Sequence, residues 1–119
     1  MAIGFIDIGS ERLEYLHIAP ERRNRPVVFL HEGLGSIAAW RDFPRTLCER
    51  LAAPGLVYSR RGYGQSSPDS LPRRADYLHR EAEQVLPALL AAFGIASPLL
   101  VGHSDGGSIA LLYAARYPL

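Results

Sequence analysis

The sequence predicts an α/β protein in which a mainly parallel, doubly wound sheet follows an opening antiparallel hairpin. Three observations support this fold class. Two segments of alternating apolar and polar residues open the chain, short apolar runs then alternate with stretches of helical periodicity, and loops rich in Gly or Pro separate them. Short apolar runs are typical of strands buried on both faces, and their alternation with helices indicates parallel strands. The predicted order of elements is β-β-β-α-β-α-β-α.

The first two strands are predicted at residues 3–8 and 12–18, where apolar side chains alternate with small or polar ones. Such alternation is typical of a strand with one buried face. Residues 9–11, Gly-Ser-Glu, have the composition of a turn, so the two strands are expected to pair as a hairpin. A polar loop follows and leads into the apolar run 27–30, which is expected to be a strand buried on both faces.

A helix is predicted over residues 40–51 because bulky apolar residues recur there at helical spacing. Pro44 is expected in its first turn, where the missing N–H of proline costs no hydrogen bond. The apolar stripe of this helix is expected to belong to the core, and it consists of Trp40, Phe43, Leu47 and Leu51. The apolar segment 55–59 then predicts the next strand.

The last three predicted elements are a helix over residues 78–93, a strand over 98–101 and a helix over 106–117. Gly94 ends the first of these helices, and Pro87 inside it predicts a kink. The loops that follow parallel strands meet at one edge of a sheet, where ligands bind. Function is therefore expected in the three loops at that edge, residues 31–36, 60–67 and 102–107.

Composition excludes several classes of function. The chain has 119 residues, with 13 Lys and Arg against 12 Asp and Glu, so no excess of charge favours binding to nucleic acid or to a membrane surface. The sequence contains neither a recognisable secretory leader nor an apolar run long enough to cross a membrane. The single cysteine, Cys48, allows no intramolecular disulfide and is expected to be a packing residue. We therefore expect a soluble, cytoplasmic protein.

The motif with the most specific chemistry is Gly102-His103-Ser104-Asp105-Gly106, which matches the pattern G-x-S-x-G. In a nucleophile elbow, the serine lies on a strained turn between a strand and a helix, and small flanking residues let the backbone approach closely. A predicted buried strand precedes this motif, and a predicted helix follows it. Ser104 is therefore a candidate nucleophile. The alternative is a glycine-rich turn in which the serine caps the helix.

A second glycine-rich loop, residues 31–36, follows the first buried parallel strand. A turn there can aim a backbone N–H toward Ser104 across the edge of the sheet. Together with the N–H of Asp105, such a group would form an oxyanion hole for a negatively charged intermediate. Taken alone, the loop is more simply interpreted as a turn that leads into a helix.

Together, these residues resemble the α/β-hydrolase fold superfamily. Its oxyanion loop is similar to FLHEGLGS, its Arg-Gly-x-Gly-x-Ser loop to YSRRGYGQSSP, and its elbow and following helix to LLVGHSDGGSIALLYAARYP. The resemblance implies a serine hydrolase that acts without a cofactor on a small-molecule ester, thioester, amide or activated C–C bond. It implies Ser104 as the nucleophile, and the N–H groups of Asp105 and of either Gly33 or Leu34 as the oxyanion hole.

The chain departs from this family in three places. Glu32 stands where the family usually has a glycine, so either Gly33 or Leu34 can supply the oxyanion N–H. Ser59 stands where an Asp often precedes the Arg-Gly loop. The family places an acid and then a histidine after the serine, whereas no histidine follows Ser104 here.

We therefore expect residues 1–119 to be the N-terminal part of one hydrolase domain, without its cap and C-terminal strands. The chain alone is expected to be inactive because it lacks the acid and histidine of the triad. The predicted strand at residues 98–101 would then have an open edge, which favours self-association.

Two other classes of function stay open. One is an NADP-binding oxidoreductase, because residues 33–38 fit the dinucleotide pattern G-x-G-x-x-A and Arg60 or Arg61 could bind a 2′-phosphate. Against it, Glu32 would lie beside the pyrophosphate. The other is a hydrolase-like module that binds a ligand without catalysis. No metal site is expected, because His31 and His103 would not converge with further ligands.

Overall fold

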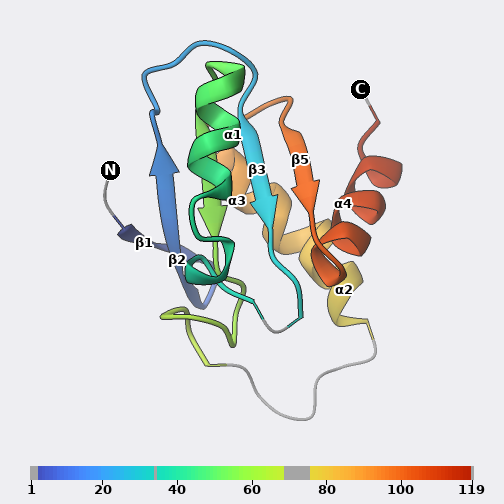
Figure 1. Cartoon of the computed structure of the whole chain (residues 1–119). Coiled ribbons are helices and arrows are strands. Elements are labelled where there is room, and N and C mark those ends of the chain that lie inside the picture. The colour runs from blue at the N-terminus through green and yellow to red at the C-terminus, as the bar shows by residue number, and fades with distance from the viewer. Residues whose placement is uncertain (1–2, 34, 69–75, 119) are drawn as a thin grey trace.

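The computed structural model describes residues 3–33, 35–68 and 76–118, which form a five-stranded sheet with helices on both faces (Figure 1). The strands are β1 (Ile3–Ile8), β2 (Glu11–Ile18), β3 (Val27–Leu30), β4 (Gly55–Tyr58) and β5 (Leu99–Gly102). Their spatial order is β1-β2-β4-β3-β5, and β3 runs parallel to both of its neighbours. β1 pairs antiparallel with β2, and β2 pairs antiparallel with β4. The predicted α/β fold class, with its opening hairpin, is confirmed, and the sheet of the described strands is mixed, with two parallel and two antiparallel pairs.

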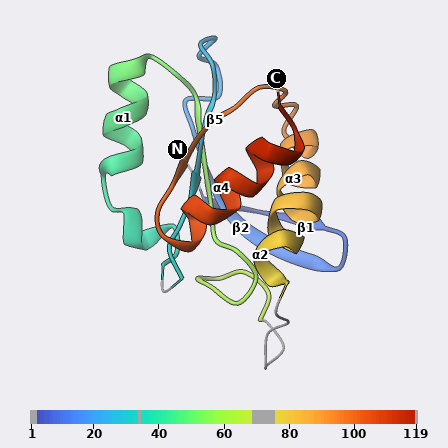
Figure 2. The ribbon, with the colours of Figure 1, turned by 90° about the vertical axis from the view of Figure 1, so that its right-hand side faces the viewer.

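The helices cover the two faces of this sheet, as Figure 2 shows. One face carries α1 (Phe43–Leu51), which follows the short 3-10 helix η1 (Ala38–Trp40). The other face carries α4 (Asp105–Arg116) and a continuous helical segment made of α2 (Tyr77–Arg80), the π-helix η2 (Glu81–Val85) and α3 (Leu86–Ala92). None of the helices in the described part of the chain has the length and apolar character that a membrane crossing requires.

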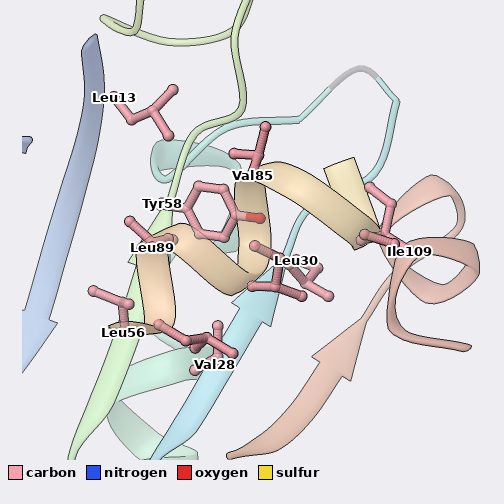
Figure 3. Packing of buried hydrophobic residues seen from close by; sticks show 11 residues of the cluster. Leu13, Val28, Leu30, Leu56, Tyr58, Val85, Leu89 and Ile109 are labelled. Carbon is pink, nitrogen blue, oxygen red and sulfur yellow. The ribbon is translucent and has the colours of Figure 1, made fainter. Parts of the chain in front are cut away.

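Strand β3 separates two hydrophobic cores, because its four residues are all fully buried. Val28 and Leu30 face one core, which they share with residues of α3 and α4 (Figure 3). Val27 and Phe29 face the other core, which contains Cys48 of α1. Successive side chains of a strand point to opposite faces, so a strand buried on both faces must be apolar at every position. β3 meets this requirement and lies in the interior of the sheet, between β4 and β5. Its end is therefore next to the loops of the candidate site.

The helix predicted over residues 40–51 begins later, at Phe43. Arg41 has a φ of +54°, which breaks the helical path between η1 and α1. A periodicity counted from Trp40 therefore does not hold along α1, and the predicted core stripe is wrong at two positions, since Phe43 and Leu51 are 48% and 42% exposed. The rest of the stripe is half-buried, and the fully buried positions of α1 are Pro44 and Cys48.

The helix predicted over residues 78–93 contains a π-helical stretch just before Pro87. Proline has no N–H to donate to the carbonyl group four residues earlier. The N–H of Leu86 instead donates to the carbonyl oxygen of Glu81, five residues earlier, so the helix widens before the proline. The widened helix still keeps one apolar face against the sheet, formed by Ala82, Val85, Leu86, Leu89 and Leu90.

Replacing Tyr58 by phenylalanine is expected to raise the free energy of unfolding by about 1 kcal/mol. Tyr58 is fully buried in the core of Figure 3, and its hydroxyl has no hydrogen-bond partner among the described residues. Burial and the nearby carboxylates of Glu81 and Glu11 raise its pKa, so the hydroxyl stays neutral. Urea denaturation checks this expectation. Tyr117→Phe is the control, because Tyr117 is 41% exposed and its hydroxyl makes a long, exposed hydrogen bond of 3.5 Å to the carbonyl oxygen of Glu83. A destabilised Tyr58→Phe protein would contradict the expectation.

Candidate active site

Ser104 lies in the turn that joins β5 to α4. Its backbone has φ +55° and ψ −114°, a conformation that residues with a side chain rarely adopt. The serine is exposed, and its side chain makes no capping hydrogen bond to α4, so the helix-cap alternative does not hold. The prediction of a strained turn between a strand and a helix is confirmed. The prediction that this strand is buried is wrong, because Leu99 and Gly102 at the two ends of β5 are exposed and the residues between them are half-buried. An exposed serine in this conformation has the geometry of a nucleophile elbow.

Two glycines make this turn possible because backbone segments touch there. A Cβ on Gly106 would lie 1.9 Å from the carbonyl oxygen of Leu30, and a Cβ on Gly102 would lie 2.4 Å from the carbonyl oxygen of Gly106. A side chain at either position would push α4 away from β3 or from the end of β5. Gly107 is different, because a Cβ there would meet nothing closer than 3.6 Å. The two glycines of the G-x-S-x-G motif are therefore required by close packing.

Asp105 is the first residue of α4, so its N–H has no acceptor within the helix. The N-terminus of a helix carries partial positive charge, which favours a developing oxyanion. Oδ2 of its side chain accepts a hydrogen bond of 2.5 Å from the hydroxyl of Tyr77 in α2, and it would lie 2.8 Å from a Cβ on Gly33. The structure thus places Gly33 beside Asp105. Leu34, the other candidate oxyanion donor, lies outside the described residues.

The loop that carries Gly33 is anchored by Arg60, which follows β4. The buried guanidinium of Arg60 donates hydrogen bonds to the carbonyl oxygens of His31 at 2.5 Å and Glu32 at 3.2 Å. Its backbone N–H donates to Nε2 of His31 at 3.0 Å. Because Nε2 accepts this bond, His31 is neutral and carries its proton on Nδ1, 2.6 Å from the carbonyl oxygen of Glu32. The ring of His31 therefore links the main chain of Arg60 to the main chain of Glu32 in the loop that carries Gly33.

The other three histidines have different surroundings. His17 on β2 packs against the ring of Phe93 with the ring centroids 5.2 Å apart, and its partial burial lowers its pKa. His79 is exposed on α2, and His103 is exposed next to Ser104. Among the described residues, none of these three histidines is hydrogen-bonded to a carboxylate, the contact that orients the imidazole of a serine-histidine pair.

The geometry does not fit a dinucleotide site. The pyrophosphate of a dinucleotide binds at the N-terminus of a helix that directly follows the glycines. Here the segment after Gly35 forms only the short helix η1, and α1 begins at Phe43. Of the two arginines considered for a 2′-phosphate, Arg60 is 2% exposed and donates to loop carbonyl groups, and Arg61 forms an ion pair of 3.7 Å with Glu11. Across residues 3–33, 35–68 and 76–118, no three His, Cys, Asp or Glu side chains are placed to hold a metal ion.

The sequence alone did not single out two residues that contact the loops of the site: Tyr77, which donates to Asp105, and Glu14, whose Oε1 accepts from the hydroxyl of Ser59 at 2.7 Å. No motif marks Tyr77, whose contact with Asp105 depends on how α2 packs against α4. A signal for Glu14 was present, because it shares a face of the predicted strand 12–18 with Leu16 and Ile18. A carboxylate on an apolar strand face indicates a buried partner.

Among the curated enzymes that are similar to this chain are two lipases. It is 30% identical over 102 residues to the (lyso)-N-acylphosphatidylethanolamine lipase of Bos taurus, an alignment that covers 85% of this chain and 29% of that enzyme. It is 32% identical over 92 residues to the sn-1-specific diacylglycerol lipase ABHD11 of Mus musculus, which covers 77% of this chain and 28% of that enzyme. The chain thus spans less than a third of the length of these two relatives.

Solved structures share the fold. A membrane phospholipase A, described as a bacterial virulence factor, superposes with a TM-score of 0.84 at 29% identity, over 98% of this chain and 36% of that protein. An epoxide hydrolase of Vigna radiata has a TM-score of 0.79 at 18% identity, over 98% of this chain and 36% of that enzyme, and this likeness concerns the fold alone. The sequence profile of the alpha/beta hydrolase fold matches residues 25–119. The chain therefore belongs to the α/β-hydrolase fold family, whose members similar to it are hydrolases.

Proposed function

We propose that the protein is the nucleophile-bearing part of a serine hydrolase, in which Ser104 attacks the carbonyl carbon of a substrate. One observation carries this proposal: an exposed serine is held at a φ of +55° between β5 and α4. Backbone strain of this kind is costly and clusters at functional sites. Arg41 has a similar φ of +54°, but at Ser104 the strain falls on the serine of a G-x-S-x-G motif between a strand and a helix, the setting of a nucleophile elbow. An elbow of two close-packed glycines holds the serine in this conformation.

In the proposed reaction, Ser104 Oγ forms a bond to the carbonyl carbon while its proton passes to a base, and the negative charge moves to the carbonyl oxygen. The N–H groups of Asp105 and of Gly33 or Leu34 stabilise that oxygen. Collapse of the intermediate expels the leaving group with a proton from the base, and water then releases the acyl group. Each step conserves charge and protons without a cofactor.

The base of this reaction is proposed to come from outside residues 1–119, as would the cap and the later strands of the domain. In this fold the acid and the histidine follow the nucleophile along the chain. The histidine in the loop of the site, His31, has its Nε2 occupied by the N–H of Arg60. The carboxylate of Asp105 accepts from Tyr77 and faces Gly33.

The proposed substrates are small molecules with an ester, thioester, amide or activated C–C bond. The two curated relatives named above are lipases, and the putative carbamate hydrolase RutD of Caulobacter vibrioides is 35% identical over 120 residues, so a carboxylic ester and a carbamate are the first substrates to assay. A cytoplasmic location agrees with a single cysteine that is buried and free. Binding of nucleic acid is not proposed, since the net charge is only +1.

A fluorophosphonate probe tests the proposed function in a version of the protein extended through a later acid and histidine. The probe reacts with activated serines, so we expect one covalent adduct, located on Ser104 by peptide mass spectrometry. The Ser104→Ala version of the same protein is expected to remain unlabelled. Labelling of another serine, or no labelling of a folded extended protein, would support the non-catalytic binding module instead.

The 119-residue chain alone is expected to be catalytically silent. A serine hydroxyl without an imidazole base is a weak nucleophile, and two oxyanion donors leave only a small residual acceleration. We expect hydrolysis of p-nitrophenyl acetate by this chain to equal that of its Ser104→Ala variant. Hydrolysis that depends on Ser104 would mean that one of the four histidines present acts as the base.

The 119-residue chain is also expected to self-associate through β5. This strand pairs only with β3 among the described strands, so the backbone groups on its other edge lack a strand partner. Leu99 on β5 is 41% exposed, and Leu111 on α4 is 74% exposed. Size-exclusion chromatography should give species larger than the 13.1 kDa monomer, whereas a single monomeric peak would contradict this expectation.

A further inference from the structure

A buried carboxylate is linked by hydrogen bonds to the loop of the candidate active site. The N–H of Ile37 donates to Oγ of Ser59 at 3.0 Å, and the Ser59 hydroxyl donates to Oε1 of Glu14 at 2.7 Å. Ser59 is fully buried and Glu14 is 7% exposed. A hydroxyl has one proton, so its donation to Glu14 leaves a lone pair of Oγ for the N–H of Ile37. The negative carboxylate polarises this hydroxyl and strengthens the bond to Ile37.

We propose that Glu14, acting through Ser59, is a positioning residue for the loop of residues 31–37, which carries the candidate oxyanion donor Gly33. The functional meaning of this inference rests on the proposed hydrolase activity, while the positioning itself does not. Glu14 belongs to β2, Ser59 follows β4 and Ile37 precedes η1, so the bonds join three segments far apart in the sequence.

The surroundings of Glu14 are shaped for a carboxylate. Burying a charged group is costly unless hydrogen bonds compensate it. Gly64 lies against the carboxylate with a φ of +53°, and a Cβ there would lie 2.1 Å from Oε1 of Glu14 and 2.7 Å from Oγ of Ser59. The main chain of Glu14 is fixed as well, because its carbonyl oxygen accepts from the N–H of Ser59 at 3.1 Å and its N–H donates to Oγ of Ser66 at 2.9 Å.

Two adjacent residues thus hold both ends of the same loop. Arg60 binds the carbonyl oxygens of His31 and Glu32 at the start of the loop, and Ser59 binds Ile37 at its end. Only five residues lie between His31 and Ile37, so a shift at either end moves the segment that contains Gly33. A catalytic hydrogen-bond donor must be held to within about 0.5 Å of its working position, which requires such support.

Hydrogen exchange of the Ile37 amide in the 119-residue chain tests the positioning. We expect Ser59→Ala to speed this exchange about tenfold or more, because Ile37 loses its acceptor, and Glu14→Gln to speed it about threefold, because the acceptor is no longer polarised by a charge. Exchange of Leu56 in β4 reports global unfolding and should change less. Ser67→Ala is the matched control, because Ser67 lies in the neighbouring loop of residues 60–67, where its Oγ accepts from the N–H of Arg12, and the substitution leaves the bond to Ile37 untouched.

Moving the carboxylate from position 14 to position 59 makes the test decisive. Ser59→Asp alone places two carboxylates side by side and should lower the urea midpoint. Combined with Glu14→Gln, the new carboxylate can accept from the N–H of Ile37 and from the introduced side-chain amide, so protection of Ile37 should return to within about twofold of the original. The inference is wrong if Ser59→Asp alone keeps the original urea midpoint and the original protection of Ile37. It is also wrong if the exchange rate of Ile37 changes in parallel with that of Leu56 in every variant. Either result leaves the labelling of Ser104 unaffected, so the two proposals fail separately.

Discussion

Gly106→Ala is expected to destabilise the protein by about 4 kcal/mol or more, enough to unfold it under ordinary conditions. The added Cβ would lie 1.9 Å from the carbonyl oxygen of Leu30 and 2.7 Å from that of His31. Neither oxygen belongs to a flexible side chain, because both are main-chain atoms at the end of β3. Relief would require α4 to move away from the sheet, which would open the core around Ile109.

Gly107→Ala is the matched control for this substitution, in the next residue of the same helix. A Cβ on Gly107 would meet only the carbonyl group of Gly102, with its oxygen at an ordinary distance of 3.6 Å. Alanine is favoured over glycine within a helix, so this variant should gain about 0.5–1 kcal/mol. Circular dichroism during urea denaturation measures the free energy of unfolding of both variants. Similar stability of the two variants would mean that α4 does not pack against β3 as described.

Ser104→Ala is expected to reduce hydrolysis by about 10⁴-fold or more in an extended protein that carries the acid and histidine of the triad. The nucleophile and its base act as a unit, so the loss of the hydroxyl leaves only the oxyanion donors. The serine side chain makes no capping bond to α4, so the alanine variant should unfold within about 0.5 kcal/mol of the original protein. Ester hydrolysis and urea denaturation of the same samples separate the two effects.

Ser108→Ala, one turn into α4 and also exposed, is the control that should keep full activity. Ser104→Gly adds a second comparison, because glycine adopts a φ of +55° without strain. Ser104→Gly should be as inactive as Ser104→Ala, and its free energy of unfolding should exceed that of the original protein by about 1 kcal/mol. An active Ser104→Ala protein would exclude Ser104 as the nucleophile, and an unchanged stability of Ser104→Gly would mean that the turn stores no strain.

The strands and the elbow could be predicted from the sequence because their causes are local. Residues 27–30 are apolar at each position, and a strand buried on both faces requires this. Gly102 and Gly106 flank Ser104 at the spacing that a tight strand-to-helix turn needs. The start of α1 was missed because it depends on a main-chain break at Arg41, which no periodicity of apolar residues reveals.

By itself, the sequence determined the α/β class, the order of the elements and the candidate nucleophile, since these follow from periodicity and from short motifs. Only the tertiary structure decided what surrounds that nucleophile. The bond from Tyr77 to Asp105 and the chain from Ile37 through Ser59 to Glu14 join residues 22 to 45 positions apart in the sequence. Such pairs form when the sheet register and helix packing bring buried polar groups within reach, and burial then makes each hydrogen bond obligatory.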